Sequence, residues 1–261
     1  MNHPFFQKNE YHTSAGKERI SHKLLFRSRI YYSIRFMMIV LCYWPRARFR
    51  CFTPESWYCS SRDVFNTLEA CGGQFDIRGL DNLSATDSPA VIISNHMSTL
   101  ETVTLPFIVL PFRYAVFVVK EQLLKVPFFG IYTRSTGCIG VTRKSPSEDF
   151  KQVLREGSEK LKNGESIIIF PQATRDTVFR PENFNSLGIK LAKKAGVPVI
   201  PLALKTDFWG NGKLIKDFGP LDLKKKIHFE FGKPFNVTGS GKKEHQRVVA
   251  FIQGRLEKWK D

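Results

Sequence analysis

The sequence predicts an α/β protein with a mostly parallel central sheet that helices cover on both sides. The first observation is a set of short apolar runs typical of buried strands, near residues 91–94, 115–119, 138–142, 166–170, 197–204 and 227–231. The second is the helical spacing of apolar residues between these runs, as at Val153, Leu154 and Leu161. Strands that alternate with helices favour a parallel sheet, because each helix returns the chain to the same edge.

Composition divides the chain into a polar tail at 1–20 that we expect to be disordered, a basic amphipathic helical region at 21–72 and a larger domain at 73–261. The middle region carries two helical patterns, at 22–44 and 54–71, and Gly72 and Gly73 end the second. Within the larger domain, Leu187 and Leu191 mark a helix that ends at Gly196, and residues 248–259 form a final amphipathic helix.

Positive charge is concentrated at the amino-terminal end. The chain has 40 Lys and Arg against 24 Asp and Glu, a net charge of +16. Its first fifty residues hold ten basic and two acidic side chains, so they supply +8 of that total. The longest uncharged apolar run, Phe36 to Trp44, is shorter than the roughly 20 residues that cross a bilayer.

We therefore expect residues 22–50 to lie on an anionic membrane surface as an anchoring, interfacial segment. Each basic group near an anionic leaflet contributes about 1 kcal/mol. The alternative is a basic helix packed on the soluble domain. A signal peptide is not expected, since the apolar stretch is far from Met1 and arginines follow it. The five cysteines form no Cys-x-x-Cys pair, which indicates reduced thiols, no metal site and the cytoplasmic face of a membrane.

His96 and Glu101 follow the apolar run at 91–94 directly. In one continuous helix, at about 100° per residue, they would lie roughly 140° apart and could not touch. They can meet if His96 lies in the turn before a helix that Ser98 caps and that begins at Thr99. The carboxylate would then orient the imidazole and stabilise its protonated form while it removes a proton from a hydroxyl. The alternative is a capping box, in which Glu101 only binds the backbone of Ser98.

Three more blocks follow in order, namely Lys120 to Gly130 with Gly137 to Arg143, Phe170 to Arg175, and Val197 to Leu202. Together with the His96 block they resemble the glycerolipid acyltransferase family, which includes the lysophosphatidic acid acyltransferases. The resemblance spans about residues 75 to 235. It implies that the domain at 73–261 is an acyltransferase domain.

The resemblance implies a role for seven side chains. His96 would be the general base and Glu101 its orienting partner. The acceptor's phosphate would be held by Lys120, Arg143 and Arg175, with Gln172 and Thr174 in the same substrate-binding group. Arg suits a bidentate phosphate contact, and Lys acts as a point charge.

Two positions depart from the family pattern. Glu101 stands where Asp is commoner, which keeps the charge and lengthens the reach by one methylene. Gln172 and Ala173 replace Glu and Gly, so a negative charge is lost and a Cβ is added. The second departure leaves the identity of the acceptor open.

The resemblance thus implies a membrane-surface acyltransferase that uses acyl-CoA or acyl carrier protein, needs no cofactor, and acts on a lysophospholipid, with 1-acylglycerol 3-phosphate as the first candidate. Both donors are anionic, which suits the positive charge. One alternative is another acceptor, such as a lyso-ornithine lipid or a different lysophospholipid. Another is a nonenzymatic binder of anionic lipid or nucleic acid. The absence of a nucleic-acid motif argues against nucleic acid as a partner.

Overall fold

The structure is a computed structural model that describes residues 9–14, 16, 29–126, 129–172, 174–212 and 219–260. Its described residues form an eight-stranded sheet in the order β1-β2-β8-β7-β3-β6-β4-β5. The strands are β1 (Glu10–His12), β2 (Phe75–Arg78), β3 (Val91–Ser94), β4 (Ala115–Lys120), β5 (Ile139–Val141), β6 (Ser166–Ile169), β7 (Val199–Lys205) and β8 (Ile227–Phe231).

Most neighbouring strands in the sheet run parallel. β7, β3, β6, β4 and β5 form a continuous parallel block, and β2 and β8 also pair in parallel. The antiparallel pairs are β1 with β2 and β7 with β8. The prediction of a mostly parallel α/β sheet is therefore confirmed. β1 and β2 were not among the predicted strands, because Asp76 and Arg78 alternate with the apolar residues of β2 and leave no apolar run.

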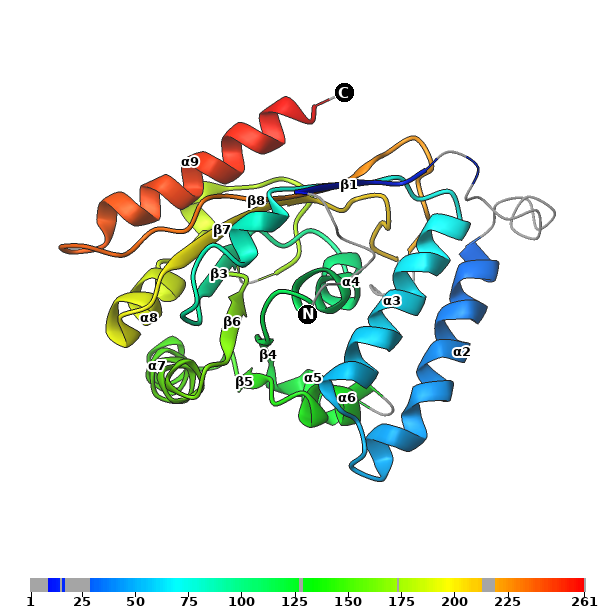
Figure 1. The fold of residues 1–261 in the computed structure, drawn as a ribbon, viewed down its shortest axis with the longest axis horizontal. Coiled ribbons are helices and arrows are strands. Elements are labelled where there is room, and N and C mark those ends of the chain that lie inside the picture. The colour runs from blue at the N-terminus through cyan, green and yellow to red at the C-terminus, as the bar shows by residue number, and fades with distance from the viewer. Residues whose placement is uncertain are drawn as a thin grey trace.

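The main helices are α2 (Arg29–Arg48), α3 (Pro54–Ala70), α4 (Leu100–Val109), α5 (Glu121–Lys125), α6 (Phe129–Ser135), α7 (Pro146–Lys162), α8 (Leu187–Ala195) and α9 (Lys242–Lys258). Short 3-10 turns lie at Leu80–Leu83 and Pro181–Asn183. Figure 1 shows α2, α3 and α4 on one side of the sheet and α7, α8 and α9 on the other.

The central strand β3 is buried on both faces, and its side chains alternate between two apolar cores. Val91 and Ile93 pack with residues of α7, α8 and α9, whereas Ile92 packs with residues of α2, α3 and α4. This period of two is the geometry of a pleated strand. A strand covered on both faces has to be apolar throughout, which is why it is visible in the sequence as one unbroken run.

Side-chain caps set the start of two helices. Thr53 accepts a hydrogen bond from the Ser56 amide at 3.2 Å in front of α3, and Ser145 accepts one from the Glu148 amide at 3.5 Å in front of α7. A proline occupies the first turn of both helices. Gly196 ends α8 with a φ of +67°, a conformation that favours glycine.

The described part of the amino-terminal tail is ordered by long-range contacts, which corrects the prediction of disorder for residues 10–12. β1 pairs with β2, and the hydroxyls of Tyr11 and Thr13 donate to the buried Glu69 carboxylate of α3 at 2.6 and 2.7 Å. Residues 1–8, 15 and 17–28 lie outside the described residues, including the first part of the helix predicted at 22–44. Contacts with a residue more than fifty positions away in the chain cannot be predicted from local sequence pattern.

α2 and α3 share one apolar core with the sheet. Tyr32 and Phe36 of α2 pack on Trp209, with ring centroids 4.8 and 5.7 Å apart, and Phe65 of α3 stacks on Phe75 of β2. The boundary expected at residue 72 therefore falls inside a continuous core. Among the described residues, none of the helices combines the length and the hydropathy needed to span a bilayer.

Candidate active site

The candidate site lies where the parallel strands β3, β6 and β7 end at the same edge of the sheet. Asn95 follows β3 and is buried, and its side-chain amide bonds both backbone groups of Leu204 on β7, at 2.8 Å to the carbonyl and 3.0 Å from the amide. An amide side chain can imitate a peptide group in this way. Asn95 thus extends the pairing of β3 with β7 and fixes where the next residue, His96, begins.

The structure brings His96 and Glu101 into direct contact. His96 lies in the turn before α4, and its Nδ1 is 2.8 Å from Oε1 of Glu101 in the first turn of the helix. α4 begins at Leu100, one residue later than expected, and Thr99 precedes it without a side-chain cap. The turn bends the chain so that two residues five apart can meet.

Glu101 is fully buried and is surrounded by hydrogen-bond donors. Besides His96, its carboxylate accepts from the amides of Met97 at 2.6 Å and Ser98 at 2.9 Å, and from the hydroxyls of Ser98 at 2.9 Å and Thr206 at 2.6 Å. Burial raises the pKa of Glu101. The hydrogen bond and charge of His96, with the bonds from Thr206 and Ser98, outweigh burial and hold this pKa below its ordinary value of 4.5. The carboxylate is therefore charged at neutral pH.

The capping-box interpretation and the dyad interpretation are both realised. The Ser98 amide donates to the Glu101 carboxylate as in a capping box, while the Ser98 hydroxyl accepts from the Leu100 amide at 3.1 Å, one residue before the usual partner. Oε1 of Glu101 meanwhile faces Nδ1 of His96. One carboxylate can do both because it offers several acceptor positions.

The imidazole of His96 is held by an aromatic wall and is open on one side. Its ring stacks on Phe170 with centroids 4.4 Å apart, and Phe170 stacks on Phe117 of β4 at 6.1 Å. Among the described residues no hydrogen bond to Nε2 is found, and the side chain is 14% exposed. With Nδ1 facing the carboxylate, Nε2 is the nitrogen available to take a proton from a substrate.

Gln172 lies behind the turn and contacts the backbone of His96. Its side-chain Oε1 accepts from the His96 amide at 2.8 Å, and the His96 carbonyl accepts from the Asp176 amide at 2.9 Å. Gln172 is buried. A glutamine and a glutamate offer the same acceptor here, so the departure from the family pattern keeps this contact. Ala173, the second departure, lies outside the described residues.

Arg175 lies at the amino end of α4. Its guanidinium donates to the Thr99 hydroxyl, next to the dyad. Thr174 is exposed beside it. The amino end of a helix attracts anions, and a guanidinium at the same place adds a full positive charge.

Lys120 and Arg143 lie at the same edge but farther along it. Lys120 ends β4 and Arg143 follows β5, and the sheet order places β4 two strands and β5 three strands from β3. At the usual strand spacing, the backbones of β4 and β5 lie about 10 and 14 Å from that of β3. The long side chains of Lys120 and Arg143 can extend across part of these distances. Arg143 has a φ of +59°, and its amide donates to the Asp149 carboxylate at 2.7 Å. Partial burial lowers the pKa of Arg143, and Asp149 opposes this shift.

Sequence reasoning missed three side chains of the site: Asn95, Phe170 and Thr206. Asn95 and Phe170 belong to the sequence blocks that indicated the site, but no role was predicted for them. Thr206 stood outside every motif, and its signal was only its position as a polar residue directly after the apolar strand β7. In a parallel sheet, such a residue shares an edge with the ends of the neighbouring strands.

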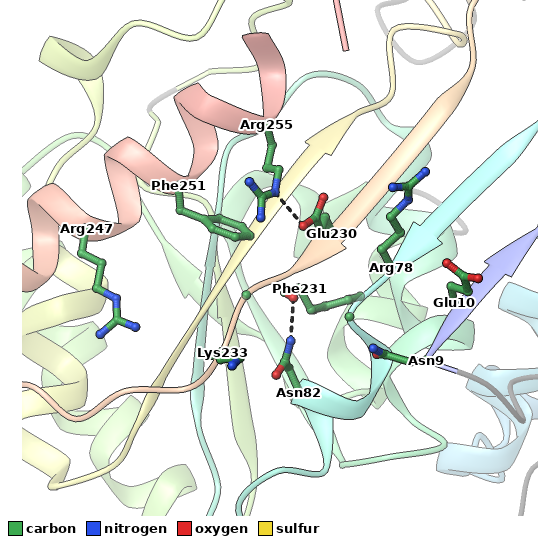
Figure 2. A pocket seen from close by; sticks show the side chains of 12 residues that line it. Asn9, Glu10, Arg78, Asn82, Glu230, Phe231, Lys233, Arg247, Phe251 and Arg255 are labelled. Carbon is green, nitrogen blue, oxygen red and sulfur yellow. Dashed lines mark hydrogen bonds and ion pairs between the residues drawn. The ribbon is translucent and has the colours of Figure 1, made fainter. Parts of the chain in front are cut away.

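A hollow of about 520 Å³ lies elsewhere, between α9 and the ends of β2 and β8, as Figure 2 shows. Arg255 forms an ion pair with Glu230 there at 2.6 Å, and Asn82 donates to the Phe231 carbonyl at 2.9 Å. Neither His96 nor Glu101 lines it. Its charged groups are thus separate from the dyad.

Comparisons with known proteins agree with this geometry. The model of the family described as Acyltransferase matches residues 74–205. A 1-acyl-sn-glycerol-3-phosphate acyltransferase of Pseudomonas aeruginosa is 33% identical over 215 residues, which are 82% of this chain and 77% of that relative. The enzyme of the same description from Escherichia coli is 32% identical over 175 residues, 64% of this chain and 65% of the relative.

A lysophospholipid acyltransferase of Arabidopsis thaliana is 30% identical over 125 residues, 46% of this chain and 29% of that protein. The crystal structure of the 1-acyl-sn-glycerophosphate acyltransferase PlsC from Thermotoga maritima superimposes with a TM-score of 0.63 at 22% identity. The match covers 91% of this chain and 96% of that one. At this sequence identity, the similarity shows that the two proteins share a fold.

Proposed function

This chain belongs to the acyltransferase family and is an O-acyltransferase, and from that premise we propose that it acylates the free hydroxyl of a lysophospholipid. The proposed acceptor is 1-acylglycerol 3-phosphate, which gives phosphatidic acid. The names of the bacterial relatives support this acceptor. The observation that carries the proposal is the 2.8 Å contact between His96 and Glu101 beside the cation Arg175.

The proposed chemistry is general base catalysis by His96. Its Nε2 takes the proton of the acceptor hydroxyl while the hydroxyl oxygen attacks the thioester carbonyl of the donor. The tetrahedral intermediate then expels the thiolate, which receives the proton from His96, so that ester and thiol are the products. Glu101 stays ionised and stabilises the imidazolium between the two steps.

The acceptor's phosphate is proposed to bind at Arg175 and the amino end of α4. This position lies next to His96, so the phosphate and the reacting hydroxyl of one glycerol unit can be held together. Lys120 and Arg143 extend the positive charge along the edge, and Thr174 adds a polar group. The anionic donor, acyl-CoA or acyl carrier protein, would approach the same positive edge.

Gln172 no longer argues for another acceptor. That alternative was motivated by the loss of a negative charge at this position, but the side chain faces the backbone of His96. We therefore assign Gln172 a supporting role behind the base. The nonenzymatic alternative is set aside, because the chain is an O-acyltransferase.

Membrane association is proposed to use the outer face of α2. Ile30, Ile34, Met37, Met38 and Leu41 recur at helical spacing and are between 38% and 62% exposed, while the opposite face packs on the core. Basic residues at the carboxyl end of the helix can contact anionic headgroups. α2 therefore fits both expectations for this segment, as a packed helix and as an interfacial one. We propose that the enzyme lies on the cytoplasmic face, where its five free cysteines would stay reduced.

The test is an acyl-transfer assay with several lysolipid acceptors and both donor types. His96→Ala should lower turnover by about three orders of magnitude, the scale of a lost general base, while circular dichroism and thermal unfolding stay near those of the unaltered protein. Arg175→Ala should raise KM for phosphate-bearing acceptors. Near-normal turnover in folded His96→Ala protein would refute the proposed base, and a preference for acceptors without phosphate would refute the proposed acceptor.

A further inference from the structure

We propose that Thr206 is a positioning residue that holds the Glu101 carboxylate in the orientation His96 needs. This inference rests on the proposed role of the His96–Glu101 dyad. Thr206 directly follows β7 and is fully buried, and its hydroxyl donates to Oε2 of Glu101 at 2.6 Å. It belongs to none of the sequence blocks that indicated the site.

The two oxygens of Glu101 face different partners. Oε1 faces Nδ1 of His96 and the Met97 amide, whereas Oε2 faces the hydroxyls of Ser98 and Thr206, and the Ser98 amide is shared between the two oxygens at 2.9 and 3.1 Å. Rotation of the carboxylate would take Oε1 away from the imidazole. The bond from Thr206 opposes that rotation because it holds the oxygen at the other end of the group.

Thr206 differs from the other donors in where it comes from. The other donors to Glu101, from His96, Met97 and Ser98, all belong to the turn before α4. Thr206 is 105 positions from Glu101 in the chain and directly follows β7, the strand that pairs with β3. Its bond therefore fixes the turn relative to the sheet.

Thr206 is itself held on both sides. Its carbonyl lies 3.0 Å from the Ser98 hydroxyl oxygen and accepts from the Trp209 amide at 3.2 Å. The Trp209 ring packs on Tyr32 and Phe36 of α2. The turn from Thr206 to Trp209 thus lies between the amino-terminal helix and the dyad. A β-branched side chain at its start has few rotamers, so the hydroxyl direction is well defined.

The hydroxyl can be tested by two substitutions that share the loss of the methyl group and differ in the hydroxyl. Thr206→Ser and Thr206→Ala both remove the methyl group, but only Thr206→Ser keeps the donor. We expect Thr206→Ala and the isosteric Thr206→Val to lower kcat about tenfold to a hundredfold, as misorientation of a general base does, with the acceptor KM changed less than about twofold. Thr206→Ser should retain kcat within about threefold.

Thr104→Val is the matched control for packing. Thr104 is also fully buried and lies in α4, but its hydroxyl donates to the Leu100 carbonyl at 2.8 Å instead of to Glu101. This variant should keep kcat while its melting temperature changes about as much as that of Thr206→Val. Equal loss of kcat in Thr104→Val and Thr206→Val would overturn the inference, and so would equal kcat in Thr206→Ser and Thr206→Ala.

His96→Ala separates this inference from the function on which it rests. If His96→Ala retains turnover, the proposed base is wrong. If His96→Ala loses turnover and Thr206→Ala keeps the kcat of the unaltered enzyme, the base stands and the role of Thr206 is wrong. If Thr206→Val does not fold, the comparison of Thr206→Ser with Thr206→Ala still decides, because these two differ only in the hydroxyl.

Discussion

At the scale of single residues, the site consists of one buried carboxylate that serves several neighbours. Glu101 contacts His96, in the orienting role that we propose, closes the turn before α4 and accepts a hydrogen bond from Thr206, which follows β7. Charge is needed for the first task, because a carboxylate stabilises an imidazolium and an amide does not. Hydrogen-bond acceptance is enough for the second. A substitution at this position should therefore affect both activity and stability.

We expect Glu101→Gln to lower turnover and also to destabilise the fold. The loss of unfolding free energy should depend on pH. The pKa of Glu101 is lower folded than its ordinary value of 4.5, so ionisation favours the folded state. This stabilisation is complete above about pH 4.5 and is lost as pH falls through the folded pKa. The difference in unfolding free energy between the unaltered protein and Glu101→Gln should shrink below that pH. Denaturant titrations at several pH values measure it, and a difference that grows on acidification would contradict the assignment.

Gln172 should act on the base and not on the acceptor. Gln172→Glu keeps an acceptor for the His96 amide and should retain most of kcat. Gln172→Leu leaves that buried amide unpaired, and a loss of about tenfold or more in kcat is expected from a cost of about 1–3 kcal/mol. Steady-state kinetics with varied acceptor distinguish the two roles, since direct binding of substrate by Gln172 would appear mainly as a rise in acceptor KM.

At the scale of elements, α2 has two faces with different partners. Tyr32, Phe36 and Val40 are buried against the core, while the stripe from Ile30 to Leu41 on the outer face is exposed. An apolar stripe of this kind beside basic residues is typical of a helix that lies in a membrane interface. Sequence periodicity alone does not distinguish the two faces, since both are apolar.

Charges placed on the outer face should weaken membrane binding without unfolding the protein. We expect Ile34→Asp and Met38→Asp to reduce co-sedimentation with vesicles that contain anionic lipid, because each places a carboxylate where apolar side chains would enter the interface. Gln246→Asp adds the same charge to an exposed position of α9, on the other side of the sheet, and should bind as before. Unchanged binding of both α2 variants would exclude this face.

At the scale of the whole molecule, the amino-terminal region is part of the catalytic fold. Tyr32 and Phe65 lie in the same core as Ile92 of the central strand, and the Tyr11 and Thr13 hydroxyls bond Glu69. The core on this side of the sheet cannot close without α2 and α3. This arrangement also joins the proposed membrane face to the turn that carries Thr206.

Removal of residues 1–70 should therefore prevent folding instead of simply releasing the protein from membranes. The truncated chain would expose the apolar faces of β2, β8 and α4, and we expect aggregation and no cooperative thermal transition. Removal of residues 1–8 leaves the described contacts of β1 in place and serves as the control. A soluble truncation at residue 70 that unfolds cooperatively would show that the region is a separate appendage.

Much of the fold and part of the site could be predicted from local pattern. The six predicted strands all occur, and the clearest of them, such as β3, β6 and β7, are buried on both faces and therefore continuous apolar runs. β1 and β2 were missed, since polar residues interrupt both strands and β1 depends on a distant partner. Contact between His96 and Glu101 was expected from a turn of six residues, which local geometry governs.

By itself the sequence determined the α/β class and most strand positions, and it offered the pairing of His96 with Glu101 as one of two interpretations, because these depend on residues close together in the chain. Tertiary structure alone decided which distant side chains complete the site. The register of β7 against β3 brings Thr206 to Glu101, and the end of β6 brings Gln172 to the His96 amide. Such contacts come from strand pairing between residues 76 and 105 positions apart, for which spacing along the chain contains no signal.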